Sequence, residues 1–159
     1  MNKILGFIER VLPIRRIIVH SILMVDPHFK FYRTVKSKEN LKIGKNSVVS
    51  YMAHLDLTAS ITIGEDCMIT DGVRIYTHSH YLLNKRDFSL KKEGKAVKPN
   101  PIVIEDNVII YSNAMIMPSV KRIHKGCMIL SGAILTRSTT APYQIWGGNP
   151  AKLIKIKEV

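Results

Sequence analysis

The sequence predicts a mainly β protein that winds as a parallel β-helix, preceded by short helices and interrupted by one long loop. Three observations predict this fold. Branched aliphatic residues recur every six positions from residue 43 onward, and small residues recur at the same interval four positions later. Apolar residues in the first 40 positions follow a helical spacing instead. The chain is therefore divided into a helical segment, residues 1–40, and a β-helix domain, residues 41–159.

Residues 1–40 are expected to form two short amphipathic helices. Ile4, Phe7, Ile8 and Val11 fall at i, i+3, i+4 and i+7, and similar spacing continues after Pro13. The segment carries eight basic and three acidic residues, which suits either contact with an anionic membrane surface or packing on the rest of the chain. Packing is preferred because neither helix gathers its lysines on one face.

From residue 41 the hexads define four coils, residues 43–60, 63–80, 104–121 and 123–140. All twelve repeating positions are branched aliphatic: Ile43, Val49, Leu55, Ile63, Ile69, Ile75, Ile104, Ile110, Ile116, Ile123, Ile129 and Leu135. A large inward residue followed by a small residue near a corner, every six residues, builds a prism with three flat faces. Its strands stack about 4.8 Å apart around a column of aliphatic side chains. The register slips at residues 60–62 and 121–122 are expected at corners.

Two cysteines occupy small inward positions of this repeat. Cys67 and Cys127 lie two coils apart, which places them about 10 Å from each other. That separation exceeds disulfide reach, so both are expected to be reduced packing residues.

The repeat breaks between residues 81 and 101. This segment contains eight charged residues and is longer than the roughly 15 residues usual for a loop in a compact domain, so a functional role is expected. His78 and His80 stand at its root, on one side of an extended strand. Ser79 points to the other side, which argues against its use as a nucleophile activated by either histidine.

Composition excludes several classes of protein. A chain of 159 residues with 46% hydrophobic and 23% charged residues fits one folded domain and not a disordered chain. Two cysteines make no disulfide framework, and the apolar runs fall short of the ~20 residues needed to cross a membrane. No secretory signal is recognised, so the cytoplasm is the expected location. The net charge of +12 indicates an anionic partner, but charge alone does not distinguish nucleic acid, an anionic membrane and a phosphorylated ligand.

These features resemble those of the hexapeptide-repeat acyltransferases, and among them the sugar O-acetyltransferases. The resemblance is carried by the hexads, by Tyr76-Thr77-His78-Ser79-His80 before the excursion, by the re-entry Pro101-Ile102-Val103-Ile104 and by the ending Gly148-Asn149-Pro150-Ala151-Lys152. It implies left-handed coils, a homotrimer with active sites between subunits, and acetyl-CoA as donor. It also implies O-acetylation of a sugar or polysaccharide precursor, in polysaccharide biosynthesis, in the cytoplasm or at the inner face of the membrane.

The resemblance also implies roles for individual residues. The catalytic histidine of the family lies five residues after the last aliphatic residue of its coil, which from Ile75 is His80, with His78 as second candidate. An imidazole suits a general base because its unperturbed pKa of about 6.5 leaves it mostly neutral at pH 7. The implied acetyl-CoA contacts are Ser131, Gly132 and Ala133 with Gly148, Lys152 and Lys155. Asn113 could hold the oxyanion, although a corner residue with left-handed backbone angles is the preferred interpretation.

Other functions remain open from the sequence. N-acetylation of an amino sugar or nucleotide sugar, or acetylation of serine, would use the same thioester chemistry. A zinc enzyme resembling the γ-class carbonic anhydrases would need three histidines from neighbouring coils, which the spacing of the six histidines does not favour. A basic module without catalytic activity is disfavoured because only 7% of residues are aromatic, and nucleic acid is not an expected partner. No metal is expected.

Overall fold

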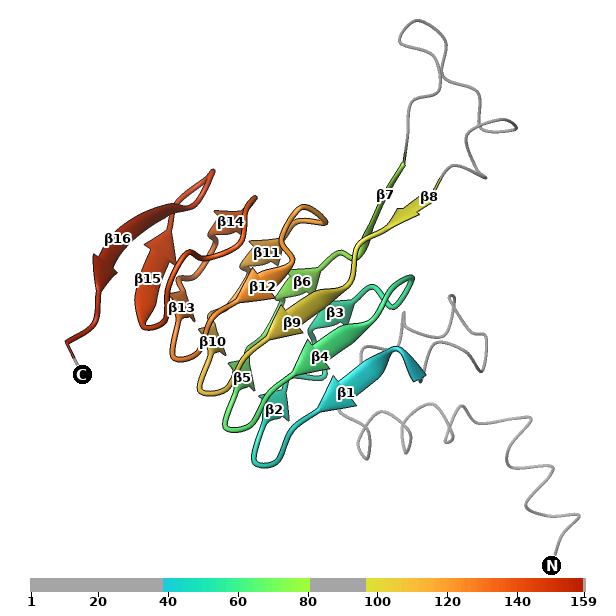
Figure 1. The fold of residues 1–159 in the computed structure, drawn as a ribbon, viewed down its shortest axis with the longest axis horizontal. Coiled ribbons are helices and arrows are strands. Elements are labelled where there is room, and N and C mark those ends of the chain that lie inside the picture. The colour runs from blue at the N-terminus through green and yellow to red at the C-terminus, as the bar shows by residue number, and fades with distance from the viewer. Residues whose placement is uncertain (1–38, 81–96, 159) are drawn as a thin grey trace, which may run out of the picture.

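The computed structural model of the protein describes residues 39–80 and 97–158 (Figure 1). The expected N-terminal helices fall outside these residues, apart from the last positions of the segment. Sixteen strands make up the described part, and most are two or three residues long. Short strands joined by tight corners are what an eighteen-residue coil with three flat faces requires.

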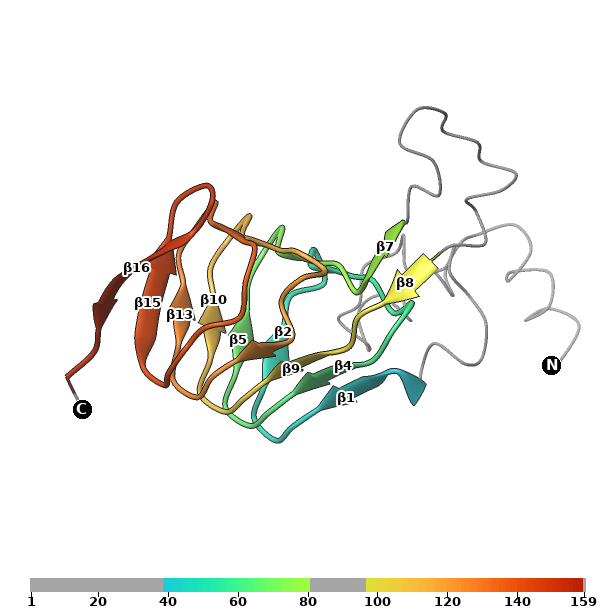
Figure 2. The same cartoon turned by 45° about the horizontal axis from the view of Figure 1, so that its top comes forward.

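Three parallel sheets form the faces of the prism. The first face contains β1 (Leu41–Ile43), β4 (Ile61–Ile63), β9 (Ile102–Ile104) and β12 (Arg122–Ile123). The second face contains β2 (Val48–Val49), β5 (Met68–Ile69), β10 (Ile109–Ile110) and β13 (Met128–Ile129), continued by β15 (Gln144–Gly147) and β16 (Lys152–Ile156). The third face contains β3 (His54–Leu55), β6 (Arg74–Ile75), β11 (Met115–Ile116) and β14 (Ile134–Leu135). Figure 2 shows the second face in profile, with its strands following one another along the coil axis.

The pairing register confirms the hexad prediction. Ile63 is the Cα partner of both Ile43 and Ile104, and Ile116 is the partner of both Ile75 and Leu135. Eleven of the twelve predicted aliphatic residues are buried. The exception is Ile43, which is 45% exposed because the first described coil has a neighbouring coil on one side only.

The corners carry the residues that tolerate left-handed backbone angles. Asn46, Asp66 and Asn107 have φ between 55° and 57° at the corner between the first and second faces, and Asn113 has φ 61° between the second and third. Short polar side chains that bond locally are the residues that accept this conformation. The corner interpretation of Asn113 is confirmed.

The expected register slips both lie at the third corner of the prism. Ser60 precedes β4 and Lys121 precedes β12, where the chain passes from the third face back to the first. The Ile102 amide bonds to the Ser60 carbonyl and the Val103 amide to the Lys121 carbonyl, each at 3.0 Å. The additional residues therefore leave the ladder hydrogen bonds intact.

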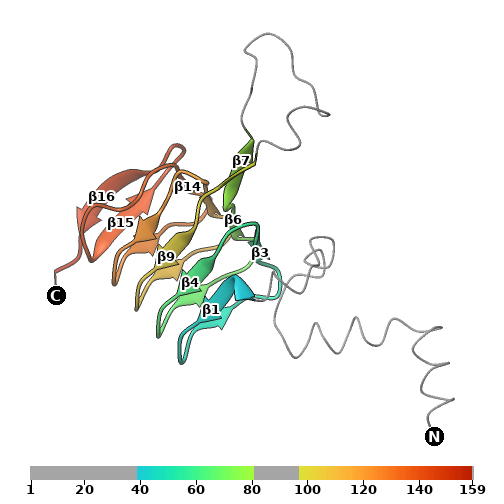
Figure 3. The ribbon, with the colours of Figure 1, turned by 45° about the vertical axis from the view of Figure 1, so that its right-hand side comes forward.

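A hairpin leaves the prism where the loop was expected. β7 (His78–His80) pairs antiparallel with β8 (Val97–Pro99), and the two strands project from the body of the coil (Figure 1). Figure 3 shows β7 pointing away from the coil in a second view. The excursion was expected at residues 81–101. Its end agrees with the structure, because the coil resumes with β9 at Ile102, but its start was wrong by about three residues, because β7 begins at His78. The reason is that both ends of the segment bond to each other before the chain re-enters the coil. Residues 81–96 lie outside the described part.

Trp146 closes the C-terminal end of the core. It is the Cα partner of Ile129, is 2% exposed, and donates its indole N–H to the Gln144 side chain at 3.0 Å. β16 then turns back antiparallel on β15. Cys67 and Cys127 are buried and free, as expected.

Candidate active site

A histidine and a carboxylate meet at the root of the hairpin. His78 begins β7, and Asp56 follows β3 one coil earlier. The Nδ1 atom of His78 lies 2.6 Å from Oδ2 of Asp56, in a contact where the carboxylate side chain is 5% exposed and the imidazole 21%. The pair is thus shielded from water on the carboxylate side and open on the imidazole side.

Four donors hold the Asp56 carboxylate. Oδ1 accepts from the amide of Thr58 at 3.0 Å and from its hydroxyl at 2.6 Å. Oδ2 accepts from the amide of Thr77 at 2.8 Å and from His78. Burial by itself raises the pKa of Asp56, but the hydrogen bonds from Thr58, Thr77 and His78 favour the charged form more strongly, so its pKa lies below the ordinary value. The carboxylate is therefore ionised at neutral pH.

Thr77 fixes the orientation of this network. Its hydroxyl donates to the Asp56 carbonyl at 2.6 Å and accepts from the Ala59 amide at 2.9 Å. The residue is fully buried, so its backbone and side chain have no solvent alternative. Coils one and two are joined at this corner by polar bonds in place of apolar packing.

The pairing determines what the imidazole can do. An ionised carboxylate accepts a hydrogen bond from Nδ1–H, so the neutral ring carries its lone pair on Nε2. A carboxylate in this position orients the ring and stabilises the imidazolium that forms when Nε2 takes a proton. An imidazole held in this way has the geometry that general-base chemistry requires.

The other two residues of β7 are placed differently. The His80 backbone pairs with Val97, and its side chain lies outside the described part of the chain. Ser79 is exposed and lines an open groove of about 350 Å³ together with Lys98, Asn100, Met117, Pro118, Ser119 and Thr136. His78 and Ser79 therefore face opposite sides of the strand, as the alternation of an extended chain predicts.

The residues implied for acetyl-CoA contacts lie toward the C-terminal end of the coil. Ser131 and Gly132 are exposed at the corner between β13 and β14, and Gly132 has open space where a side chain would stand. The Ala133 side chain is fully buried, so only its backbone could reach a ligand. Gly148 has φ 93° and its carbonyl accepts from the Ile134 amide at 3.0 Å.

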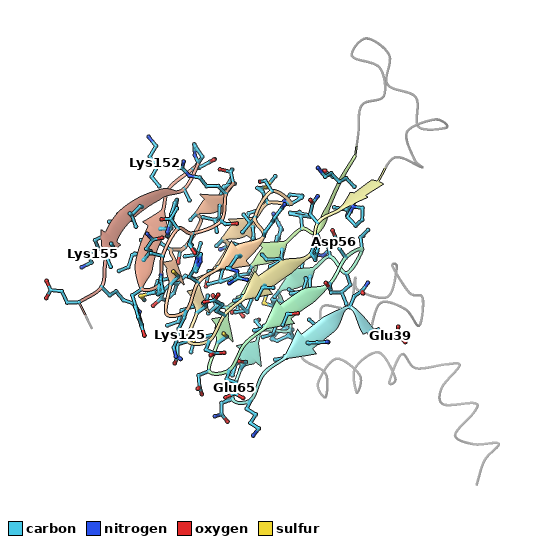
Figure 4. All side chains as sticks on the ribbon, in the orientation of Figure 1. Glu39, Asp56, Glu65, Lys125, Lys152 and Lys155 are labelled. Atoms are coloured by element: carbon cyan, nitrogen blue, oxygen red, sulfur yellow. The ribbon has the colours of Figure 1, made fainter. Side chains whose placement is uncertain are left out.

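Two of these implied residues are lysines on the last strand. Lys152 and Lys155 are both exposed on β16. Figure 4 shows them at the opposite end of the coil from Asp56. Four strand spacings separate β5 from β16 on the second face, which corresponds to about 19 Å. The structure therefore does not bring these lysines together with the histidines, and a ligand that touched both would be extended along the coil axis.

Asp56 was missing from the residues predicted on sequence alone. The repeat nevertheless marks Asp56 as unusual. The equivalent position in the later coils holds a neutral residue each time: Tyr76, Met117 and Thr136. A lone carboxylate among neutral residues at a corner, one coil before a pair of histidines, identifies a partner for one of them.

Neither a group of metal-ligating side chains nor a membrane-spanning helix is present among the described residues. Within residues 39–80 and 97–158, no three or more His, Cys, Asp or Glu side chains are grouped as metal ligands would be. In the same part of the chain, no helix has the length and apolar character that crossing a bilayer requires.

The chain resembles known acetyltransferases in sequence. A Schizosaccharomyces pombe protein named as an acetyltransferase is 33% identical over 116 residues, which are 73% of this chain and 53% of that protein. The 2,3,4,5-tetrahydropyridine-2,6-dicarboxylate N-acetyltransferase of Staphylococcus aureus is 43% identical over 56 residues, 35% of this chain and 23% of that enzyme. The chain thus spans about half the length of the first relative and a quarter of the second. No protein-family model matches it.

Solved structures of acetyltransferases share its fold. The hexapeptide-repeat acetyltransferase of Vibrio cholerae in complex with acetyl-CoA superimposes with a TM-score of 0.66 and 26% identity, covering 76% of this chain and 62% of that one. A galactoside acetyltransferase in complex with coenzyme A gives a TM-score of 0.64 and 26% identity, covering 74% and 55%. A coil of the opposite hand would not superimpose along its length, so these matches support the left-handed winding expected from the resemblance.

Proposed function

We propose that the protein transfers an acetyl group from acetyl-CoA to a hydroxyl group of a sugar or polysaccharide precursor, on the cytoplasmic side of surface-polysaccharide biosynthesis. The observation that carries the proposal is the Asp56–His78 pair at 2.6 Å, at the root of a hairpin that leaves a hexapeptide coil. The similarity to acetyltransferases in sequence and fold supports the same reaction class.

The general base belongs to β7, which carries both candidate histidines. The family resemblance favours His80. The hydrogen-bond geometry favours His78, because the bond between Nδ1 and Asp56 leaves the lone pair of the His78 ring on Nε2. In either case the imidazole removes the hydroxyl proton as the oxygen forms a bond to the acetyl carbonyl carbon. The carbon–sulfur bond then breaks, and the proton passes to the departing thiolate. Such a base contributes roughly 10²- to 10⁴-fold to the rate.

The C-terminal half of the coil offers a fitting surface for acetyl-CoA, whose thioester supplies the activated acetyl group. The open corner at Ser131 and Gly132 allows a ligand to approach the backbone. Lys152 and Lys155 are exposed cations suited to the phosphates. This placement accounts for the distance between the lysines and β7, because acetyl-CoA carries its thioester and its phosphates at opposite ends.

We also propose a homotrimer, with the second face of the prism as a contact surface. Its outward residues stack in register as an apolar ladder: Val48, Met68, Ile109, Met128 and Ile145. Val48 is 50% and Met68 47% exposed. The outward residues of the first face, in contrast, include Lys42, Thr62 and Arg122. A continuous apolar row over five strands suits contact with another copy of the chain.

The decisive experiment measures thiol release from acetyl-CoA with a panel of neutral, amino and nucleotide sugars, and serine. Release with hydroxyl acceptors supports the proposal, and preference for amino sugars would replace it by N-acetylation. His80→Ala and His78→Ala then separate the two bases, since loss of the base lowers turnover at least a hundredfold. His124→Ala is the matched control, because His124 bonds to Thr139 at a different corner of the prism. If both β7 variants keep turnover within threefold of wild type, the proposed chemistry is wrong.

A further inference from the structure

Three further side chains, Arg74, Tyr76 and His54, lie on or beside the third face near His78. Arg74 and Tyr76 precede it on the same strand and corner, with Ile75 and Thr77 buried between them. His54, one coil earlier, is the Cα partner of Arg74, and its ring lies 5.8 Å from that of Tyr76. The Asp56–His78 pair is thus flanked by an aromatic pair and then by an arginine.

Arg74 is a cation without an acidic partner in the described chain. It is exposed, and its neighbours along the third face are His54 and Met115. The ion pairs among the described residues are His78–Asp56 and Arg122–Glu105. Asp56 already accepts four hydrogen bonds from Thr58, Thr77 and His78, and it forms no ion pair with Arg74.

The spacing places this cation within reach of an acceptor bound at His78. Four residues of extended chain span at most about 13 Å between the Cα atoms of Arg74 and His78. The side chains shorten the gap between the guanidinium and the imidazole when they lean toward each other. A guanidinium binds carboxylate and phosphate groups with two parallel hydrogen bonds. The ring of Tyr76 lies between Arg74 and His78 along the chain and offers a flat surface, with His54 beside it on the neighbouring coil.

We propose that Arg74 binds an anionic substituent of the acceptor, so that the preferred substrate is a sugar carrying a carboxylate or a phosphate. This inference deepens the proposed function and rests on it.

The test compares sugars that share one ring and differ in the group at carbon 6, using the chain of 159 residues and thiol release from acetyl-CoA. Galactose, galacturonic acid, its methyl ester and galactose 6-phosphate separate charge from shape, and separate carboxylate from phosphate. We expect one of the two charged sugars to give a kcat/KM at least tenfold above that of galactose and of the ester. Arg74→Gln should lower that kcat/KM roughly 10- to 100-fold, because it removes hydrogen bonds to a charged group. The loss should appear as a higher KM for the charged sugar, with kcat within threefold of wild type.

Arg122→Gln is the matched control, since Arg122 is an exposed arginine of the first face, and it should leave the charge preference unchanged. Equal kcat/KM for charged and neutral sugars in the wild type would overturn the inference. So would an Arg74→Gln variant that raises KM for acetyl-CoA and leaves the acceptor preference intact, because the bound anion would then belong to the donor.

Binding measured without acetyl-CoA, by titration calorimetry with the same four sugars, separates this inference from the proposed function. Arg74-dependent binding of a charged sugar without any thiol release supports the inference and refutes the reaction. Thiol release with no charge preference in binding supports the reaction and refutes the inference. A protein that binds none of the charged sugars more tightly than galactose also refutes it.

Discussion

Replacement of Asp56 by asparagine tests the network on which the candidate site depends. The two oxygens of the carboxylate each accept from one backbone amide, Thr58 to Oδ1 at 3.0 Å and Thr77 to Oδ2 at 2.8 Å. An asparagine keeps one acceptor oxygen, so its NH₂ group must face one of these two amides. The Thr58 hydroxyl can rotate, and the His78 ring can change its tautomer, so that each accepts a hydrogen bond from this NH₂ group. A backbone N–H can only donate.

The expected cost follows from that single unsatisfied donor. Leaving one buried donor without an acceptor destabilises a fold by about 1–3 kcal/mol, and Thr77 is fully buried. We therefore expect Asp56→Asn to lower the free energy of unfolding by about that amount at pH 7, measured by urea unfolding at one fixed protein concentration. Asp66→Asn is the control, because the exposed Asp66 carboxylate accepts only a 3.2 Å bond from Asn46 in a solvated corner, and it should change stability by less than about 0.5 kcal/mol.

The pH dependence gives a second, independent readout. The folded pKa of Asp56 lies below the unfolded value of about 3.9, so its contribution to stability is complete above that pH and is lost as pH falls through the folded pKa. The difference between wild type and Asp56→Asn should be constant from pH 7 to about pH 5 and should shrink below about pH 4. A variant as stable as wild type at pH 7, or a difference that grows on acidification, would refute the network as described.

Two further changes test the assembly and the corners. Met68→Glu places a charge in the middle of the apolar ladder and should convert trimers to single chains in sedimentation velocity, whereas Thr62→Glu on the first face should not; an unchanged trimer with Met68→Glu would exclude that face as the contact. Gly72→Ala should cost more stability in urea than Gly132→Ala, because both positions have φ near 70° but only at Gly72 would a new Cβ overlap the Asn113 side chain. Equal losses would show that backbone strain alone, about 1–2 kcal/mol, sets the cost.

Much of the fold could be predicted because the repeat is a packing requirement. Each hexad must place one large side chain inside, and a residue such as Ile110, fully buried between Ile69 and Ile129, has no tolerated polar replacement. The corners followed from small residues and from Asn113, which accepts left-handed backbone angles, for the same steric reason. The hairpin at β7 and β8 was only partly predicted, since residues that leave the core are no longer constrained by it.

The site was predicted in part, and the limit has a physical cause. His78 and His80 stood out because they border a break in the repeat, whereas Asp56 lies 22 residues before His78 in an unbroken coil. Its contact with His78 depends on the register between coils and on the slip at Ser60. Together these decide which residues of neighbouring coils lie next to each other at the third corner.

The sequence by itself determined the three-faced coil of this protein, because large aliphatic side chains every six residues can all be buried when short parallel strands stack around one axis. The tertiary structure decided which side chains meet on the outside of the prism: Asp56 with His78, His54 with Tyr76, and Arg74 with no acid in the described chain. Outward residues make no contribution to the core, so the hexad pattern carries no information about them. Only the alignment of one coil upon the next brings them together.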